Sequence, residues 1–288
     1  MHTRKNFMDK PDPLNDYLFL KVMGEKGDEE QLLSFLNAVL CQQPNRLVSV
    51  EILENKILSP QILGDKSSVL DVLAELEDRT KVNIEVQIRN LGNTEKRSLY
   101  YWSREYTRNL SSGQDYKELP KVIEINIVDF NFLNTANFHT VFRLREDTEH
   151  DLILTDALEI HFVNMVKFRR LKDTDITNNP LHRWLTYLDK YSPAVIIREV
   201  TKMDGAIRKA KEKQSIVLSE YMARREYEMR LMALSDQTSM VNYARREGMT
   251  KGHAKAKRED AKKMKELGCS VQLIAEVTGL SEKEIEKY

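Results

Sequence analysis

The sequence predicts an α/β core that is followed by an all-helical C-terminal part. Two runs in which apolar and polar residues alternate, 69–76 and 82–88, predict the two strands of a β-hairpin. A helical pattern precedes them at 28–40 and another follows at 94–110, and from Pro180 onward the pattern stays helical. Strands interleaved with helices and then a run of helices indicate a sheet packed between helices, with a helical extension.

The remaining elements follow from their period and their end signals. A short helix is expected over 15–23, ended by Gly24, and Asp28 with Gln31 has the form of a capping box for the next helix. β-Branched runs predict strands over 121–130, 138–145 and 158–168. In the tail, Ser270, Gly279 and the pair Ser281/Glu284 predict two short capped helices around a glycine turn, an arrangement that resembles half of a helix-turn-helix.

Composition narrows the class of protein. The chain has 288 residues and two cysteines, Cys41 and Cys269, which excludes a disulfide framework and a cysteine-rich zinc site. No apolar run reaches the about 18 to 20 residues that cross a bilayer, and the charged opening residues do not form a secretory signal. We therefore expect a cytoplasmic protein with no membrane contact. The expected division is a core over 1–195, a helical connector over 196–240 and a basic helical tail over 241–288.

Charge is unevenly distributed although the net charge is zero. Between Val241 and Lys265 there are nine Lys/Arg against three acidic residues, so a basic tail follows an acidic body. Such a segment attracts phosphates in a strongly salt-dependent way. A solvated charged helix explains it equally well. Gly248 and Gly252 would permit a close contact between helices, so a homo-oligomer formed through the tail is a further expectation.

The predicted hairpin brings two acidic residues together. If it turns about Asp78, Asp71 lies opposite Glu85, and Gln87 shares their face. Adjacent carboxylates repel each other unless a cation neutralises them, and Mg²⁺ is suited to one or two carboxylates with several waters. Two acids that simply face solvent are the alternative, and a shift of register by one residue would separate them.

Several segments, in order, resemble a known family: NDYLF at 15–19, LNAVL at 36–40, DVLA at 71–74, IEVQ at 84–87, RSLYYWS at 97–103 and the strand at 120–130. Together they resemble the Rpn family of recombination-promoting nucleases and transposases, a branch of the PD-(D/E)XK nuclease superfamily. The resemblance extends from Asn15 to about Trp184. It implies a restriction-endonuclease-like fold, a mixed sheet flanked by helices, and Mg²⁺-dependent cleavage of phosphodiester bonds.

The resemblance also implies roles for individual residues. Asp71, Glu85 and Gln87 would be catalytic, and Asp71 and Glu85 would bind Mg²⁺ together with the carbonyl of Val86; Mn²⁺ or Ca²⁺ are alternative ions. Gln87 stands where the superfamily has a lysine, as is common in this family. A neutral amide can orient water but cannot offset phosphate charge, so more of the activation would depend on the metal. Lys96 or Arg97 is a candidate for the missing cation.

The helix at 94–110 carries a second signal. Arg97, Tyr101, Arg104 and Arg108 recur at helical spacing, which puts three guanidinium groups and a phenol ring on one stripe. Arginine matches phosphate oxygens, and aromatic rings support bases or sugars, so the stripe predicts a DNA contact. A solvated face with ion pairs to Glu105 is the alternative.

The carboxylate hairpin and the family resemblance together predict a Mg²⁺-dependent DNA endonuclease, and the resemblance implies that it acts in DNA recombination or transposition. The rival is a non-catalytic DNA-binding or assembly protein that keeps the nuclease fold, and the glutamine at position 87 is the feature that favours it.

Overall fold

The computed structural model describes residues 10–40, 47–53, 72–108, 110 and 115–287. The chain divides into two compact units, 1–227 and 228–288, and the boundary lies within one long helix. The division at 195 and 240 that the sequence suggests stays a prediction. No helix in the described parts is long and apolar enough to cross a bilayer.

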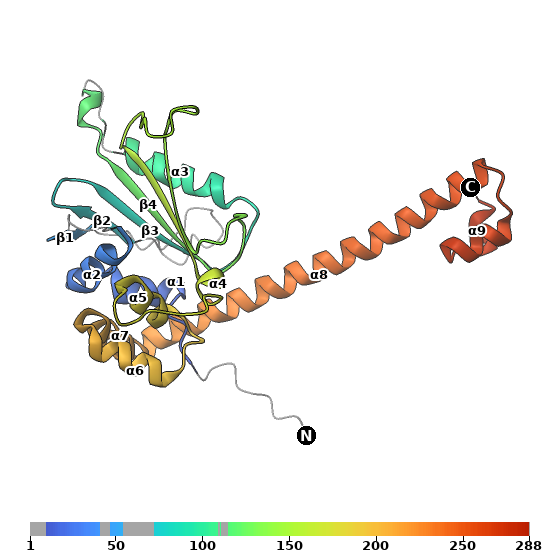
Figure 1. Cartoon of the computed structure of the whole chain (residues 1–288). Helices are drawn as coiled ribbons and strands as arrows, with labels where there is room; N and C mark the ends of the chain where they lie inside the picture. The colour runs from blue at the N-terminus through green and yellow to red at the C-terminus, as the bar shows by residue number, and fades with distance from the viewer. Residues whose placement is uncertain (1–9, 41–46, 54–71, 109, 111–114, 288) are drawn as a thin grey trace. The chain divides into compact units, whose positions relative to one another are not determined.

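The first unit is built on a mixed sheet, which in the described residues has six strands in the order β1-β2-β3-β4-β6-β5 (Figure 1). The pairings of β3 with β4 and of β4 with β6 are parallel, and the others are antiparallel. The strands are β1 Val50–Ile52, β2 Val72–Leu76, β3 Lys81–Gln87, β4 Val122–Val128, β5 His139–Arg143 and β6 Leu158–Asn164. This architecture, with helices on the sheet and a helical C-terminal region, confirms the predicted fold class.

The hairpin of β2 and β3 has the predicted register. Val72 pairs with Ile84 and Leu73 with Asn83, which is the alignment expected for a turn about Asp78. In the turn, the backbone N–H of Arg79 donates to the Leu76 carbonyl at 3.0 Å, and Arg79 has a positive φ of 68°. Asp71, which precedes Val72, lies outside the described residues, so its place opposite Glu85 stays a prediction.

One face of the sheet is covered by α3, Thr94–Thr107 (Figure 1). The indole Nε1 of Trp102 donates to the Val122 carbonyl at 3.2 Å, and the ring packs against a buried apolar cluster that includes Leu158, Ile160 and Phe162. Because strand side chains alternate, this face also receives Glu85 of β3 and Asn126 of β4. The cover of α3 is what buries the polar side chains described below.

Helices α1 Asp16–Met23, α2 Glu29–Leu40 and α5 Pro180–Leu188 cover the other face (Figure 1). Trp184 of α5 is fully buried, meets Phe35 edge to face at 5.7 Å and donates to the Ser34 hydroxyl at 3.1 Å. The end of α1 approaches the sheet closely, since a Cβ at Gly24 would lie 2.9 Å from Cγ2 of Val72. Gly24 is therefore required by space at this position.

One predicted strand needs correction, and two short elements were not predicted. The strand predicted to end at Phe168 ends at Asn164, and α4, Met165–Phe168, follows it. The reason is a cap: the Asn164 side chain accepts a hydrogen bond from the backbone N–H of Lys167 at 3.0 Å, which starts a helical turn. The short strand β1 and a 3-10 turn, η2 at Tyr116–Glu118, carry no periodic signal in the sequence.

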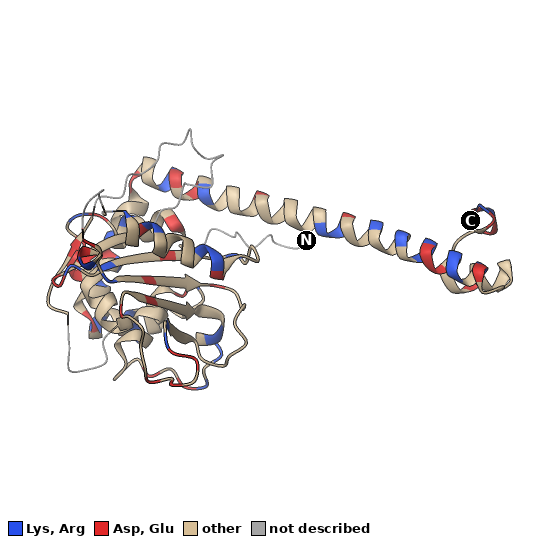
Figure 2. Cartoon of the chain, turned by 90° about the horizontal axis from the view of Figure 1, so that it is seen from above, with Lys and Arg blue, Asp and Glu red and all other residues tan. Residues whose placement is uncertain are grey.

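Helices complete the chain: α6 Ala194–Met203, α7 Gly205–Ser219, α8 Tyr221–Glu266, α9 Val271–Thr278 and α10 Glu282–Ile285. The predicted caps of the tail are present: Ser270 accepts from Leu273 N–H at 3.3 Å, and Ser281 and Glu284 form a capping box. Gly279 is in the left-handed region with a φ of 66°. Lys and Arg residues recur along the C-terminal half of α8 (Figure 2), and residues 235–260 are exposed.

Candidate active site

Buried polar side chains gather on the α3 face of the two central strands. In β3 they are Asn83, Glu85 and Gln87, and the parallel register sets Glu85 beside Asn126 of β4. The Glu85 residue is 1% exposed and Gln87 is 7% exposed. Buried polar groups need partners, and a buried carboxylate needs a cation or several donors. The partners of these groups therefore show what the site is built to hold.

A hydrogen-bonded chain fixes the orientation of the Gln87 amide. Its Nε2 donates to Oε2 of Glu85 at 3.1 Å and to Oδ1 of Asn126 at 3.2 Å. The same Oδ1 accepts from the Ser98 hydroxyl at 2.8 Å, and Nδ2 of Asn126 donates to the His161 carbonyl at 3.4 Å. Since both acceptors face Nε2, the oxygen is the atom of the Gln87 amide that remains for a ligand. Gln87 therefore presents an acceptor to the site and no charge.

Arg97 of α3 is the cation beside Glu85. Its guanidinium forms an ion pair with Oε1 of Glu85 and lies 5.3 Å from the centre of the Tyr101 ring. Burial raises the pKa of the Glu85 carboxyl, and Arg97, Gln87 and more weakly Arg104 offset only part of this effect. The site therefore holds a carboxylate whose charge is incompletely compensated.

Oε1 of Glu85 is buried and receives no well-formed hydrogen bond from the described residues, despite its ion pair with Arg97. A buried carboxylate oxygen whose partner is a single guanidinium is the kind of atom that a hard divalent cation can bind in its place. The carbonyl of Gln87 accepts from Asp129 N–H of the β4 side at 3.0 Å, so the preceding carbonyl, that of Val86, points away from β4. The Glu85 carboxylate and the Val86 carbonyl are oxygen groups of the kind that a hard cation prefers, whereas no group of three or more His, Cys, Asp or Glu side chains within the described ranges forms a metal site.

The predicted DNA-binding stripe of α3 is only partly available. Tyr101 is 5% exposed, with the guanidiniums of Arg97 and Arg104 at 5.3 and 5.1 Å from its ring centre. Arg104 and Arg108 both form ion pairs with Glu105, at 3.4 and 3.2 Å, and keep much of their side chains in solvent. Arg104 and Arg108 can reach a ligand. Tyr101 is buried beneath Arg97 and Arg104 and offers no surface on which a base could stack.

A second buried polar cluster lies on the opposite face, at the β5–β6 edge. Nε2 of His139 faces Nδ1 of His161 at 2.9 Å, and Nε2 of His161 faces Oε1 of Glu159 at 2.7 Å. Arg143 and Lys121 form ion pairs with Glu159 at 2.9 and 3.2 Å. The Glu159 carboxylate is thus surrounded by donors.

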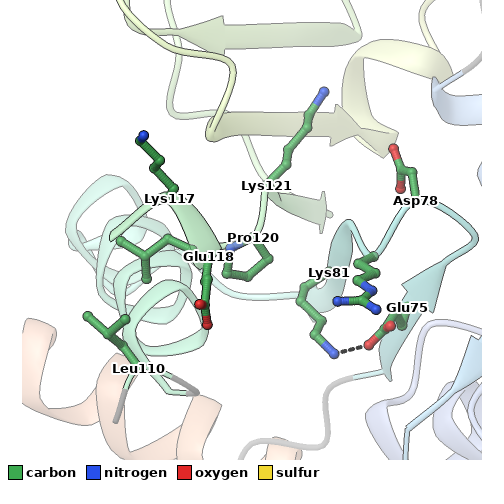
Figure 3. Close-up of a pocket in the computed structure, with 10 residues that line it drawn as sticks. Glu75, Asp78, Lys81, Leu110, Lys117, Glu118, Pro120 and Lys121 are labelled. Carbon is green, nitrogen blue, oxygen red and sulfur yellow. Dashed lines mark hydrogen bonds and ion pairs between the residues drawn. The ribbon is translucent and has the colours of Figure 1, made fainter. Parts of the chain in front are cut away.

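A hollow of about 530 Å³ lies at the turn end of the β2–β3 hairpin (Figure 3). Its lining includes the Lys81–Glu75 ion pair, Glu118 and Lys121, and the charges of both signs mix with Leu110 and Pro120. Glu85, Gln87 and Arg97 do not line it. This hollow is therefore separate from the buried carboxylate.

Ser98 and Asn126 were not singled out from the sequence, although they orient Gln87. A signal was present: Glu124 and Asn126 are polar residues two apart in a strand that is otherwise apolar, and both are fully buried. The partner of Asn126 is Ser98, which lies 28 positions earlier in the sequence. No local sequence pattern reveals a contact over this separation.

The comparisons with known proteins show the family of the chain. A family model described as PD-(D/E)XK nuclease family transposase matches residues 13–244. The chain belongs to this family. No curated protein and no solved structure gives a significant match. The matched range includes the whole sheet, α3 and the first half of α8.

Proposed function

We propose that this family member is a DNA endonuclease that depends on Mg²⁺, with Mn²⁺ or Ca²⁺ as ions that could replace it in binding. The observation that carries the proposal is the buried Glu85 carboxylate on a central strand, with one oxygen lacking a well-formed hydrogen bond and a glutamine amide aimed at the other. Glu85 and the Val86 carbonyl would hold the ion, with Asp71 as the predicted third ligand. A bound ion would offset phosphate charge and make a water molecule more acidic.

The residues around the ion have separate tasks. The oxygen of the Gln87 amide would accept a hydrogen from the attacking water and so direct its lone pair to phosphorus. Arg97, Arg104 and Arg108 would bind phosphate oxygens, and the guanidiniums of Arg97 and Arg104 lie over the Tyr101 ring. By family membership, the cleavage would serve DNA recombination or transposition.

A non-catalytic DNA-binding or assembly protein is the second candidate. The observation that favours it is that both Gln87 hydrogen bonds are made within the protein and that position 87 supplies no cation. Such a protein would bind DNA through the same arginines and through the tail, without hydrolysing it.

Nicking of supercoiled plasmid distinguishes the two. The wild type should nick in Mg²⁺ and not in EDTA, and Asp71→Ala and Glu85→Gln should each abolish nicking. Glu51→Gln, the same change at an exposed position of β1, is the matched control and should nick like the wild type. DNA binding without nicking in Mg²⁺ or Mn²⁺ would favour the second candidate.

The basic tail is proposed to add nonspecific DNA affinity. Deleting residues 241–288 removes nine Lys/Arg that lie between Val241 and Lys265. The slope of log affinity against log salt should become shallower, by about 0.9 for each phosphate that the tail would otherwise neutralise. An unchanged slope, in a protein that keeps its melting temperature, would show that the tail does not bind phosphate.

A further inference from the structure

Arg97 is the accessible half of an otherwise buried ion pair. Its side chain is 30% exposed, whereas that of its partner Glu85 is 1% exposed. The guanidinium therefore lies between solvent and the one Glu85 oxygen that lacks a well-formed hydrogen bond. Any cation that reaches this oxygen from solvent has to share it with Arg97 or displace Arg97.

The geometry points to Arg97 as an exchangeable counterion: it neutralises Glu85 while no metal is bound and moves to a substrate phosphate when metal binds. This inference rests on the proposed function, because it assigns Arg97 a second position in the same site. The exchange differs from a fixed phosphate contact because, in the exchange, the metal and Arg97 compete for one oxygen of Glu85.

Arg97 is poorly satisfied where it stands. Its Nε is buried and has no acceptor among the described residues, and Glu85 is the acid with which its guanidinium pairs. The ring of Tyr101 supports the guanidinium at 5.3 Å, a contact that constrains it less than a second carboxylate would. A guanidinium carries five N–H donors in a planar fork, so it can engage another acceptor without first breaking a second ion pair. Moving the Arg97 side chain away from this position therefore costs little free energy once another cation binds Glu85.

Electrostatics favours both halves of the exchange, the departure of Arg97 from Glu85 and its binding to a phosphate. A divalent ion on Oε1 of Glu85 would stand beside the guanidinium, and like charges at such distances in a partly buried site repel strongly. A DNA phosphate offers the guanidinium two oxygens in the geometry that suits it. Because Gln87 is neutral, Arg97 is the cation of α3 already at the reaction centre, and the exchange would deliver it to the phosphate when the metal is in place.

The neighbouring Arg104 provides a matched control. Its guanidinium lies on the same Tyr101 ring, at 5.1 Å, but its ion pair is with Glu105. Arg97→Met and Arg104→Met each remove one charge from this ring, and only the first removes the partner of Glu85. Arg97→Lys keeps the charge and separates its effect from that of packing.

Calorimetric titration of the full chain with Mn²⁺, without DNA and at pH 8, tests the competition. Arg97→Met should bind Mn²⁺ more tightly than the wild type, on the order of tenfold. Arg104→Met and Arg97→Lys should stay within about threefold of the wild type. Equal or weaker binding by Arg97→Met, in a variant whose melting temperature shows that it is folded, would overturn the exchange. Loss of Mn²⁺ binding in every variant, the wild type included, would overturn the proposed metal site as well.

DNA affinity in Ca²⁺ and in EDTA tests the second position. In Ca²⁺, Arg97→Met should make the slope of log affinity against log salt shallower by about one relative to the wild type, and by much less in EDTA. Arg104→Met should change the slope equally in both. An Arg97→Met effect that does not depend on Ca²⁺ would mean that Arg97 is a fixed phosphate ligand and would overturn the exchange.

Discussion

Glu85 and Glu159 are both buried acids of the same sheet, on opposite faces, and their surroundings differ. Glu159 meets two cations, Arg143 and Lys121, and the ring of His161. Although burial alone would raise its pKa, the hydrogen bonds from His161 and Arg143 hold the pKa of Glu159 well below its usual range. Burial dominates at Glu85, so there the pKa is raised.

The difference is between a carboxylate with several cationic partners and one with a single ion pair. A buried carboxylate whose oxygens are all paired stabilises the conformation around it and has no lone pair left for a ligand. A buried charge with an oxygen that lacks a well-formed hydrogen bond is costly unless something else binds it. Glu159 accordingly stabilises the β5–β6 edge, and Glu85 is the carboxylate that we propose binds an ion.

The largest expected effect comes from removing each charge in turn. Glu85→Gln should lower nicking at least about 1,000-fold, because the ion loses its ligand, and should leave the free energy of unfolding unchanged or raised. Glu159→Gln should lower the free energy of unfolding by about 1 to 3 kcal/mol and keep nicking near the wild-type rate. Urea denaturation together with a nicking assay measures both. The comparison fails if the two variants behave alike.

A smaller effect is expected at Gln87. Gln87→Ala should lower nicking about 10- to 100-fold, because the water loses an acceptor while the metal site remains. Gln87→Lys should retain activity or raise it, since an added cation offsets developing phosphate charge. Rates at saturating Mg²⁺ decide this. If Gln87→Ala is as inactive as Glu85→Gln, then Gln87 does more than orient water.

Ser98 should act through Asn126 and Gln87. Ser98→Ala removes the 2.8 Å hydrogen bond to Oδ1 of Asn126, so Gln87 is oriented less firmly, and we expect kcat to fall about 3- to 10-fold with little change in KM. Ser103→Ala, a change at a serine of α3 whose hydroxyl donates to a carbonyl of its own helix, is the control. Equal effects of the two changes would point to helix stability as the cause.

The smallest effect is a pH dependence from the second cluster. Burial, and next the nearby His161, lowers the pKa of His139 from 6.5 to about 4. Because the pKa of His139 is lower in the folded state than in the unfolded state, neutral His139 contributes fully to the free energy of unfolding above pH 6.5. This contribution is lost as the pH falls toward 4. With its partial exposure we expect a loss of about 1 to 2 kcal/mol and a fall of a few degrees in Tm. Calorimetric scans should show that lowering the pH from 6.5 to 4 reduces the Tm of His139→Phe less than that of the wild type. An identical reduction in Tm would assign the pH dependence to other groups.

The sequence predicted the hairpin and the place of Glu85 and Gln87 within it, because a period of two residues and a polar turn set the register that Val72 and Ile84 show. It did not predict the burial of Tyr101, since helical spacing defines a stripe but not the side of α3 that meets the sheet. The partners of Arg97 and Asn126 were also out of reach, because they come from contacts between α3 and strands distant in sequence.

A crystal structure of the full chain grown with Mn²⁺, with the ion located by its anomalous signal, tests the central claim most directly. We predict a peak about 2.0 to 2.3 Å from Oε1 of Glu85 and from the Val86 carbonyl, with the Arg97 guanidinium moved off the carboxylate. A Glu85 that still pairs with Arg97 in saturating Mn²⁺, with no peak beside it, would contradict the account.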